Sequence, residues 1–373
     1  MSPLGQTGRS IRMSEILTLA TASSVPKQLR YLAYPRVDYL ELQQRLQTDI
    51  IDYTAYERGG GALLRQLETY LRSDLFLTWL GLSQRAQHQL VFAMSERAGI
   101  PFAFFNRLLP QRRPFVSMFT CWSDRQERVI KNFNLFSGMD GIAVHCQSMK
   151  QHLVSLGAPA AHTHVLPYSI DHQFFAPLPQ VSQEKNLIVT LGETRSRDYD
   201  ALFRAVADLP VNVQVAAAGM WYAREKDRRL RAPLPPNVTP IGHLSPTCLR
   251  EWYARAQFVV LPLRDLVYSA GATSYLEASS MGRAVIAFRS RGITDCVIDG
   301  ETGILLDPGD VAGMREAIAY LLANPQEARR LGENARQRIE ESLNLDMYVY
   351  RLIAFLQSYL PSSSSLSTSR AAL

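Results

Sequence analysis

Residues 268–310 read YSAGATSYLEASSMGRAVIAFRSRGITDCVIDGETGILLDPGD. The stretch begins with small, nearly uncharged residues and then places one acid, Glu277, inside an apolar run. The residues before it, AQFVVLPL at 256–263, predict a buried strand, and TSYLEASSMG predicts a helix that begins near Thr273. The lone carboxylate therefore lies about one turn inside a helix that closely follows a strand.

The loop between this strand and this helix has the composition of a ligand-binding turn. Gly271 and its small neighbours let a ligand approach the backbone closely. The start of the helix, at Ala272 and Thr273, offers amide groups and a partial positive charge that suit a phosphate or a sugar hydroxyl. A carboxylate at Glu277 does not favour phosphate, but it can accept hydrogen bonds from two adjacent ribose hydroxyls. The alternative is an acid that is solvated on the helix surface.

On both sides of this stretch, short apolar runs alternate with longer amphipathic ones, which predicts parallel sheets covered by helices. The first series predicts strands at 15–21, 48–54, 74–81, 101–106, 114–122, 141–146 and 164–169, with helices that include 38–47, 61–72 and 82–99. The second series predicts strands at 186–192, 211–219, 237–242, 256–263, 284–289 and 302–307. Three helices are expected at the end, at 310–324, 325–342 and 344–360.

The length of 373 residues favours two domains. Residues 176–186 are polar, contain Pro and Gln, and lack a period, so they predict a linker between two Rossmann-like sheets. The helix at 346–360 has an apolar face broad enough for packing between domains. The Ser-rich residues 361–373 predict a disordered tail.

A second candidate ligand loop follows the strand that ends at Gly192. It carries Arg195 and Arg197, and two guanidinium groups at the carboxyl end of a strand can hold a diphosphate. The alternative is that both are solvated loop arginines. Asp198 and Asp200 match an Asp-x-Asp metal pattern, but their places at a helix start also suit capping and the helix dipole. No metal site is predicted, because the histidines lack metal-ligand spacing.

Composition excludes several classes of function. The net charge of +6 comes without a basic run of five residues, which argues against a nucleic-acid partner. The four cysteines are far apart and form no Cys-x-x-Cys pair, so we expect a reducing, cytoplasmic location. The sequence contains no stretch of 18 apolar residues, so no membrane-spanning helix is predicted.

Residues 268–310 resemble the nucleotide-sugar motif of retaining glycosyltransferases of family four, which have the GT-B fold. LEASSMGRAVIAF and VIDGETGILLDPGD carry this resemblance most clearly. Three other segments are similar to motifs of the same family and occur in the same order: VLPYSIDHQFFAPLP at 165–179, LGETRSRDY at 191–199, and NVTPIGHLSPTCLREWYARAQFVVLPL at 237–263. The resemblance covers about residues 165–350.

The resemblance implies an α/β chain of two Rossmann-like domains facing across a cleft. It implies an acceptor domain at 1–175, a nucleotide-sugar domain at 176–345, and a helix at 346–360 that crosses back to the first domain. The implied activity is retaining transfer of a hexose from a nucleotide-sugar to an acceptor hydroxyl, without a metal or other cofactor. The residues implied at the donor site are Gly192, Gly242, Ser269, Gly271, Ala272, Thr273 and Glu277, with Arg195 or Arg197 on the leaving diphosphate.

Two features leave the activity and the acceptor open. Ser269 stands where the family has an acid that contacts the donor sugar, so a catalytically weak homologue acting as a partner or regulatory subunit is one alternative. A nucleotide-sugar epimerase is another.

Asp124 either orients an acceptor hydroxyl or caps the helix that follows it. The acceptor is a glycan, a lipid or a small aglycone, and the apolar and basic residues 103–115 favour peripheral contact with the inner face of a membrane.

Overall fold

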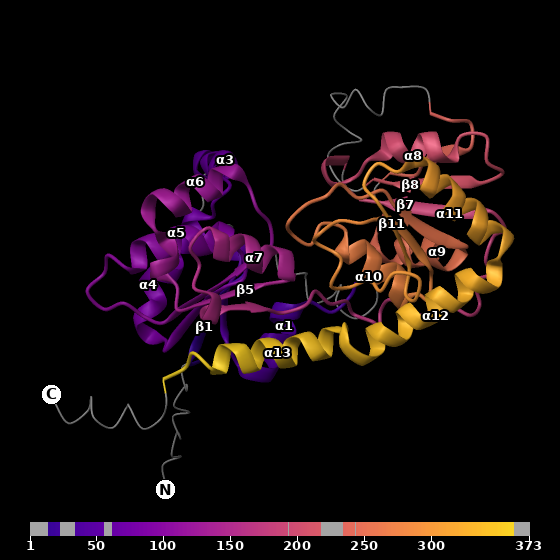
Figure 1. Cartoon of the computed structure of the whole chain (residues 1–373). Coiled ribbons are helices and arrows are strands. Elements are labelled where there is room, and N and C mark those ends of the chain that lie inside the picture. The colour runs from indigo at the N-terminus through magenta and orange to yellow at the C-terminus, as the bar shows by residue number, and fades with distance from the viewer. Residues whose placement is uncertain are drawn as a thin grey trace, which may run out of the picture.

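The computed structural model describes residues 14–22, 34–55, 62–192, 194–217, 234–242 and 244–361. As predicted, these residues form two separate parallel sheets (Figure 1); each has six strands, whereas seven were predicted for the first. The tail expected at 361–373 lies outside the described residues beyond Pro361. No helix in the described ranges has both the length and the apolar composition needed to cross a bilayer.

The first sheet has the strand order β2-β1-β3-β4-β5-β6. Its strands are β1 (Ile16–Leu19), β2 (Asp49–Ile51), β3 (Leu90–Ala93), β4 (Phe115–Phe119), β5 (Gly141–Val144) and β6 (Thr163–Val165). Its helices are α1 (Asp38–Leu46), α3 (Ala62–Leu71), α4 (Leu75–Gln84), α5 (Glu96–Asn106), α6 (Asp124–Phe133) and α7 (Gln147–Ser155). Side chains of α4, α5, α6 and α7 join one buried cluster on this sheet.

The second sheet has the order β12-β11-β10-β7-β8-β9. Its strands are β7 (Leu187–Leu191), β8 (Asn212–Ala216), β9 (Val238–Pro240), β10 (Phe258–Leu261), β11 (Val285–Phe288) and β12 (Ile304–Leu306). The helices are α8 (Tyr199–Val206), α9 (Pro246–Arg255), α10 (Ala272–Ser280), α11 (Val311–Ala323) and α12 (Pro325–Ser342). Strand order reverses between β7 and β10, and ligands of open α/β sheets bind beyond the carboxyl ends of the strands at such a point.

Helix α13 (Leu345–Gln357) leaves the second domain and packs on the first sheet, as expected. Asn344 caps it by accepting a hydrogen bond from the amide of Met347 at 2.9 Å. Its apolar face is buried against strands β1, β3, β4 and β5. Figure 1 shows α12 and α13 as one long yellow path beneath both domains. The buried residues of α13 in this contact are Leu345, Tyr348, Val349, Leu352, Phe355 and Leu356.

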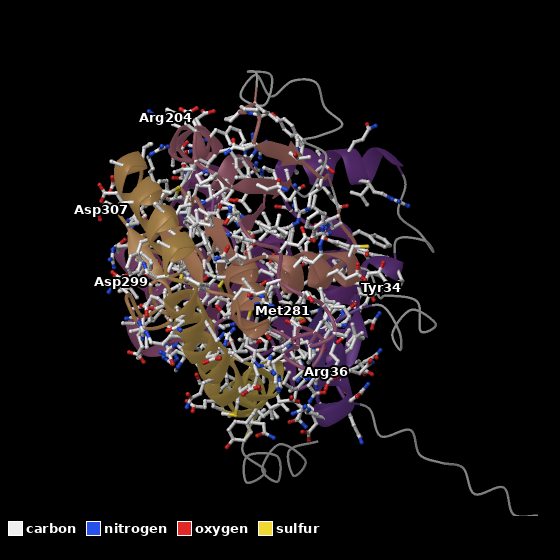
Figure 2. The ribbon with its side chains drawn as sticks, turned by 90° about the vertical axis from the view of Figure 1, so that its right-hand side faces the viewer. Tyr34, Arg36, Arg204, Met281, Asp299 and Asp307 are labelled. Carbon is white, nitrogen blue, oxygen red and sulfur yellow. The ribbon has the colours of Figure 1, made fainter. Side chains whose placement is uncertain are left out.

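An ion-pair cluster joins three segments that are distant in sequence. Arg36, labelled in Figure 2, donates to Asp171 at 2.9 Å and to Asp346 at 3.1 Å. Arg45 on α1 also pairs with Asp346. The cluster therefore connects the first domain, the segment between the two sheets and the start of α13.

Residues 74–106 differ from the sequence-based expectation. The strand predicted at 74–81 is helix α4, the helix predicted at 82–99 contains strand β3, and the strand predicted at 101–106 is part of helix α5. The physical reason is that α4 and α5 are apolar on most sides, so neither shows a helical period. Ser95 marks the true start of α5, because its hydroxyl accepts a hydrogen bond from the amide of Arg97.

Candidate active site

Two glycines shape the carboxyl edge of the second sheet at its switch point. Gly192 follows β7 with φ +112°, and Gly271 precedes α10 with φ +90°, a backbone region that favours glycine. A Cβ atom on Gly192 would lie 2.4 Å from a guanidinium nitrogen of Arg197, and one on Gly271 would lie 2.5 Å from the side chain of Leu263. Both positions therefore need glycine for space as well as for conformation.

Arg197 lies between these two glycines. Its side chain is 3% exposed and donates to the carbonyl of Leu191 at 2.7 Å and to the hydroxyl of Ser274 at 3.2 Å. The guanidinium thus joins the end of β7 to the first turn of α10. Arg195, in the 3-10 turn at Thr194–Ser196, is exposed. Of the two candidate arginines, only Arg197 is buried at the switch point.

Glu277 lies mostly buried on α10 and is linked to α9. The hydroxyl of Tyr253 donates to its carboxylate at 2.8 Å and also approaches the carbonyl of Ser274 at 3.4 Å. Burial raises the pKa of Glu277 to about 7, although the hydrogen bond from Tyr253 lowers it in part. Glu277 is therefore partly protonated near neutral pH, unlike an acid on an open helix surface.

This pKa predicts a pH-dependent effect of Glu277→Gln on the stability of the protein without ligand. When folding raises the pKa of an acid, its protonated form favours the folded state. This contribution to stability is fully present below the pKa of the unfolded state, and it is lost as the pH rises through the pKa of the folded state. Gln still accepts from Tyr253 and carries no charge. We expect equal melting temperatures at pH 4.5 and a more stable variant at pH 8, by about 1 to 3 kcal/mol. A pH series of thermal melts measures this, and a variant less stable than wild type at pH 8 contradicts the assignment.

The loop that leads into α10 holds three other residues predicted at the donor site. The side-chain oxygen of Ser269 is buried and has no hydrogen-bond partner among the described residues. The amide of Ala272, in contrast, donates to the carbonyl of Ser269 at 3.2 Å, so this amide already has a hydrogen-bond partner within the loop. Thr273 is exposed in the first turn and contacts the side chain of Tyr168.

The remaining predicted residues of the second domain lie in two places, after β9 and at the start of α8. Gly242 follows β9, at the edge of the sheet away from the switch point, with φ +72° and open space where a Cβ would lie. Asp198 caps α8 by accepting from the amide of Ala201 at 3.2 Å, and Asp200 lies in the first turn. Across the described residues, no group of three His, Cys, Asp or Glu could hold a metal ion.

The first domain meets this edge through the start of α7. The hydroxyl of Ser148 donates to the carbonyls of Val267 at 2.8 Å and Arg291 at 3.1 Å. The amide of Gln147 donates to Asp295 at 2.5 Å. The loop before α10 is therefore held against the carboxyl edge of the first sheet.

A cavity of about 260 Å³ lies between the two domains. It is bounded by residues that follow strands β3 to β6, by the start of α1, by α13 and by Thr273 of α10. The cavity therefore joins the carboxyl edges of both sheets, where a donor held at the switch point would meet an acceptor. Its polar lining residues include Arg36, Asp38, Thr120, His145, Tyr168 and Asp171.

Two titratable side chains of this cavity were not predicted from the sequence. His145 directly follows β5, and burial lowers its pKa to about 4, so the imidazole is neutral. Its Nδ1 lies 3.0 Å from the carbonyl of Leu166, which assigns the proton to Nδ1 and leaves Nε2 as an acceptor. Burial also raises the pKa of Asp38 in the first turn of α1. The place of His145 at the end of a strand was a usable signal, whereas nothing in the sequence marked Asp38.

Asp124 is not the cap of α6. The cap of α6 is Ser123, whose hydroxyl accepts from the amide of Gln126, and Asp124 is exposed in the first turn. The cavity lining includes Thr120 from the same loop but not Asp124. The capping expectation was wrong by one residue, because Ser and Asp are both good caps and stand side by side.

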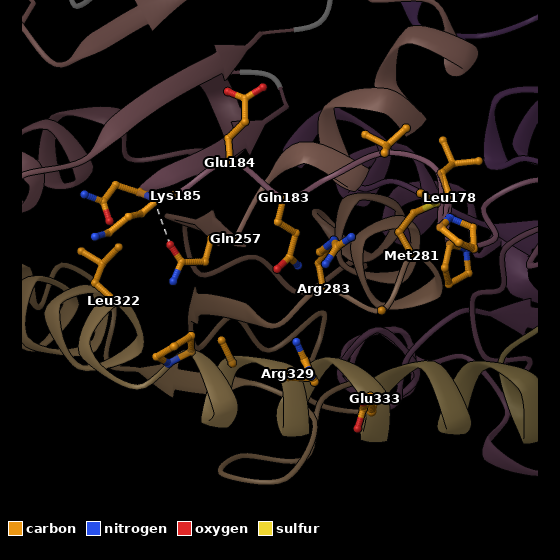
Figure 3. A pocket seen from close by; sticks show the side chains of 17 residues that line it. Leu178, Gln183, Glu184, Lys185, Gln257, Met281, Arg283, Leu322, Arg329 and Glu333 are labelled. Atoms are coloured by element: carbon orange, nitrogen blue, oxygen red, sulfur yellow. Dashed lines mark hydrogen bonds between the residues drawn. The ribbon is translucent and has the colours of Figure 1, made fainter.

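A second cavity, of about 600 Å³, lies at the opposite end of the second sheet. It is bounded by residues that precede β7, β10 and β11, by the 177–186 segment and by α12. Figure 3 shows Gln183, Arg283 and Arg329 around its open centre. Arg283 donates to the last carbonyls of α9, and burial lowers its pKa to about 10. Because this cavity lies at the amino ends of the strands, it is not the candidate ligand site of the sheet.

The second domain is similar in sequence to known proteins. Residues 175–338 match the family described as glycosyl transferases group 1. MMP alpha-(1->4)-mannosyltransferase of Mycolicibacterium hassiacum is 25% identical over 62% of this chain and 55% of its own length. Glycogen synthase of Mycobacterium tuberculosis is 35% identical over 26% of this chain and 23% of its own length. The chain thus spans about half, or less, of the curated relatives it matches.

Solved structures extend the likeness to the whole chain. The Anabaena protein HepE, in complex with UDP and glucose, superposes with a TM-score of 0.69 at 16% identity, over 92% of this chain and 100% of that one. Sucrose-phosphate synthase from Thermosynechococcus elongatus gives a TM-score of 0.65 at 20% identity, over 75% of this chain and 76% of that one. The chain therefore has the GT-B fold, and its residues 175–338 match the family of glycosyl transferases group 1.

Proposed function

We propose that this protein transfers a hexose from a nucleotide-sugar to an acceptor hydroxyl, with retention of anomeric configuration. One observation carries the proposal. At the switch point of the second sheet, Arg197 and Glu277 are joined through Ser274 and Tyr253, so a guanidinium and a carboxylate flank one helix start. These are the two groups that a nucleoside diphosphate requires, one for phosphate and one for ribose hydroxyls.

The names of relatives support a hexose donor. One relative from Mycolicibacterium smegmatis, 28% identical over half of this chain, is named a GDP-mannose-dependent mannosyltransferase that acts on a phosphatidylinositol monomannoside. HepE was crystallised with UDP-glucose as well as with UDP and glucose. A cytoplasmic location, where nucleotide-sugars are made, belongs to the same proposal, and four cysteines that form no disulfide fit it.

In the proposed reaction, the acceptor enters the cavity between the domains. Neutral His145 offers Nε2 as a hydrogen-bond acceptor, and Asp38, whose pKa burial raises, offers a carboxyl group. Together these groups can orient a hydroxyl of the acceptor. The buried guanidinium of Arg197 on the second domain stabilises the charge that develops as the diphosphate leaves. This chemistry needs no metal ion.

The test is a transfer assay with UDP- and GDP-hexoses at concentrations that saturate the enzyme, run in about 1 mM and about 10 mM EDTA. Proton NMR of the product then identifies its anomeric configuration. We expect full activity in EDTA and the same anomeric configuration in donor and product. Loss of activity in EDTA that Mn²⁺ or Mg²⁺ restores would contradict the metal-free route. Conversion of the donor sugar without an acceptor would identify an epimerase instead.

A further inference from the structure

The charges of the first domain are unevenly distributed between its interior and its outer helices. Residues 62–140 contain ten Arg and Lys but six Asp and Glu. Three of those six acids, Glu68, Asp74 and Glu96, are buried. The remaining acids of this segment are Asp124, Glu127 and Asp140, so its surface side chains are net positive.

The same helices also expose large apolar side chains. Tyr70 on α3 is 70% exposed, Leu108 just after α5 is 64% exposed, and Phe133 at the end of α6 is 48% exposed. Single exposed apolar residues are ordinary on a protein surface, but a group of them on one face is not. Helices α3, α5 and α6 lie together along the outer side of the first domain in Figure 1.

Helix α6 joins these side chains into one surface. Near its start, the guanidinium of Arg125 lies 4.9 Å from the ring centre of Tyr70 and donates to the Tyr70 carbonyl at 2.6 Å. At its end, the ring of Phe133 lies 5.5 Å from that of Phe104, which packs edge-on against Phe105 at 5.2 Å.

The rest of the helix continues this pattern. Arg128 is exposed one turn after Arg125, and Arg107 donates to the carbonyl of Phe133 at 2.5 Å. We define the α6 surface as Tyr70, Phe105, Leu108, Arg125, Arg128 and Phe133. It alternates cations with aromatic and aliphatic groups over the length of a ten-residue helix, about 15 Å.

We propose that the α6 surface binds the anionic surface of a lipid bilayer. Exposed Tyr, Phe and Leu insert at the level of the headgroups, while Arg side chains pair with lipid phosphates. Charge complementarity favours an anionic membrane over a second copy of this positive surface. Leu108 and Phe133 extend apolar groups that a nucleic-acid backbone would leave in water, which favours lipid over nucleic acid.

The position of α6 relates the proposed contact to the cavity between the domains. Thr120 lines that cavity, and Ser123, three residues later, caps α6. A membrane bound at the α6 surface therefore lies next to the loop at 120–123, one end of which lines the cavity. This part rests on the proposed function: an amphiphilic acceptor could enter the cavity while its apolar part stays in the bilayer. The membrane contact itself does not depend on activity.

The experiment is co-sedimentation of the full chain with vesicles, without donor or acceptor. Vesicles of phosphatidylcholine alone are compared with vesicles that also contain phosphatidylglycerol, in low and high salt. We expect binding to the anionic vesicles, weakened by salt because exposed charges are screened. The double variant R125Q/R128Q should lower the partition coefficient on the order of tenfold or more. L108S/F133S should lower it by a similar factor through lost insertion, about tenfold.

Matched variants on the second domain control for general changes in charge and hydrophobicity. Tyr320→Ser on α11 and Arg329→Gln on α12 also alter exposed side chains, and we expect them to bind vesicles as wild type does. Thermal melts show whether each variant is folded.

The proposal is overturned if the wild-type protein does not bind anionic vesicles, or if both α6 variants bind them as wild type does. It is also overturned if duplex RNA binds more tightly than vesicles and the α6 variants lose that binding. Vesicle binding with no sugar transfer would refute the proposed function and leave this inference intact.

Discussion

Arg197→Ala is expected to lower turnover on the order of a hundredfold or more, with a much smaller loss of donor affinity. The reason is that negative charge builds on the diphosphate as the sugar bond breaks, so a cation held beside it contributes most in the transition state. Arg197 fits this role because it is buried at the switch point and is fixed by hydrogen bonds to Leu191 and Ser274. Steady-state kinetics and titration with the nucleoside diphosphate separate the two effects.

Arg195 supplies the matched control for this experiment. It lies two residues away but is exposed, so we expect Arg195→Ala to keep near-normal turnover. Arg197→Lys should recover only part of the loss, because an ammonium cannot bind two phosphate oxygens in fork geometry. Thermal melts are needed because Arg197 also joins β7 to α10, and its loss should destabilise the fold. Near-normal turnover of Arg197→Ala would mean that the diphosphate is held elsewhere.

Glu277→Gln is expected to weaken binding of the nucleoside diphosphate by about tenfold to a hundredfold at pH 8. The variant keeps volume and one acceptor oxygen but removes the charge that strengthens hydrogen bonds from two ribose hydroxyls. Wild-type affinity should also rise between pH 6 and pH 8, because the pKa of Glu277 is about 7 and hydroxyl donors favour the ionised form. Calorimetric titrations over this range measure both effects.

The phosphate groups of the nucleotide also ionise near neutral pH, so the pH dependence alone does not isolate Glu277. Their contribution is common to wild type and Glu277→Gln, and the difference between the two pH profiles therefore belongs to the side chain. Parallel profiles with equal affinity would show that Glu277 does not contact the nucleotide. The same variant is expected to stabilise the free protein at pH 8, so lost affinity cannot be attributed to a damaged fold.

The second domain could be predicted largely from its sequence. Most of its strands are short and apolar and are followed in the sequence by Gly, Ser or a charged residue, which indicates both the parallel sheet and the edge where ligands bind. Glu277 stood out because it is a single acid in an apolar run. The choice between Arg195 and Arg197 could not be made, since both lie in one loop and only packing against Gly192 and Gly271 distinguishes them.

The first domain was harder to predict for physical reasons. Helices α4 and α5 are apolar on most sides, so the sequence had no period that separates a buried helix from a strand. The interdomain cavity depends on segments that are distant in sequence, such as the start of α1 and the loop after β5. Asp38 and His145 line one cavity only because both domains and α13 pack together, and no local pattern encodes that arrangement.

The most direct test of a nucleotide-sugar site at this edge is a thermal-shift screen of the wild-type protein with UDP, GDP and ADP and their hexose derivatives. A ligand that binds only the folded state at a hundred times its dissociation constant stabilises the protein by about 2.7 kcal/mol. We predict that at least one of these nucleotides raises the melting temperature by several degrees, on the order of that energy, and that Glu277→Gln reduces the shift. If none of them changes the melting temperature at millimolar concentration, the protein has no nucleotide-sugar site, and the proposed transfer reaction is wrong.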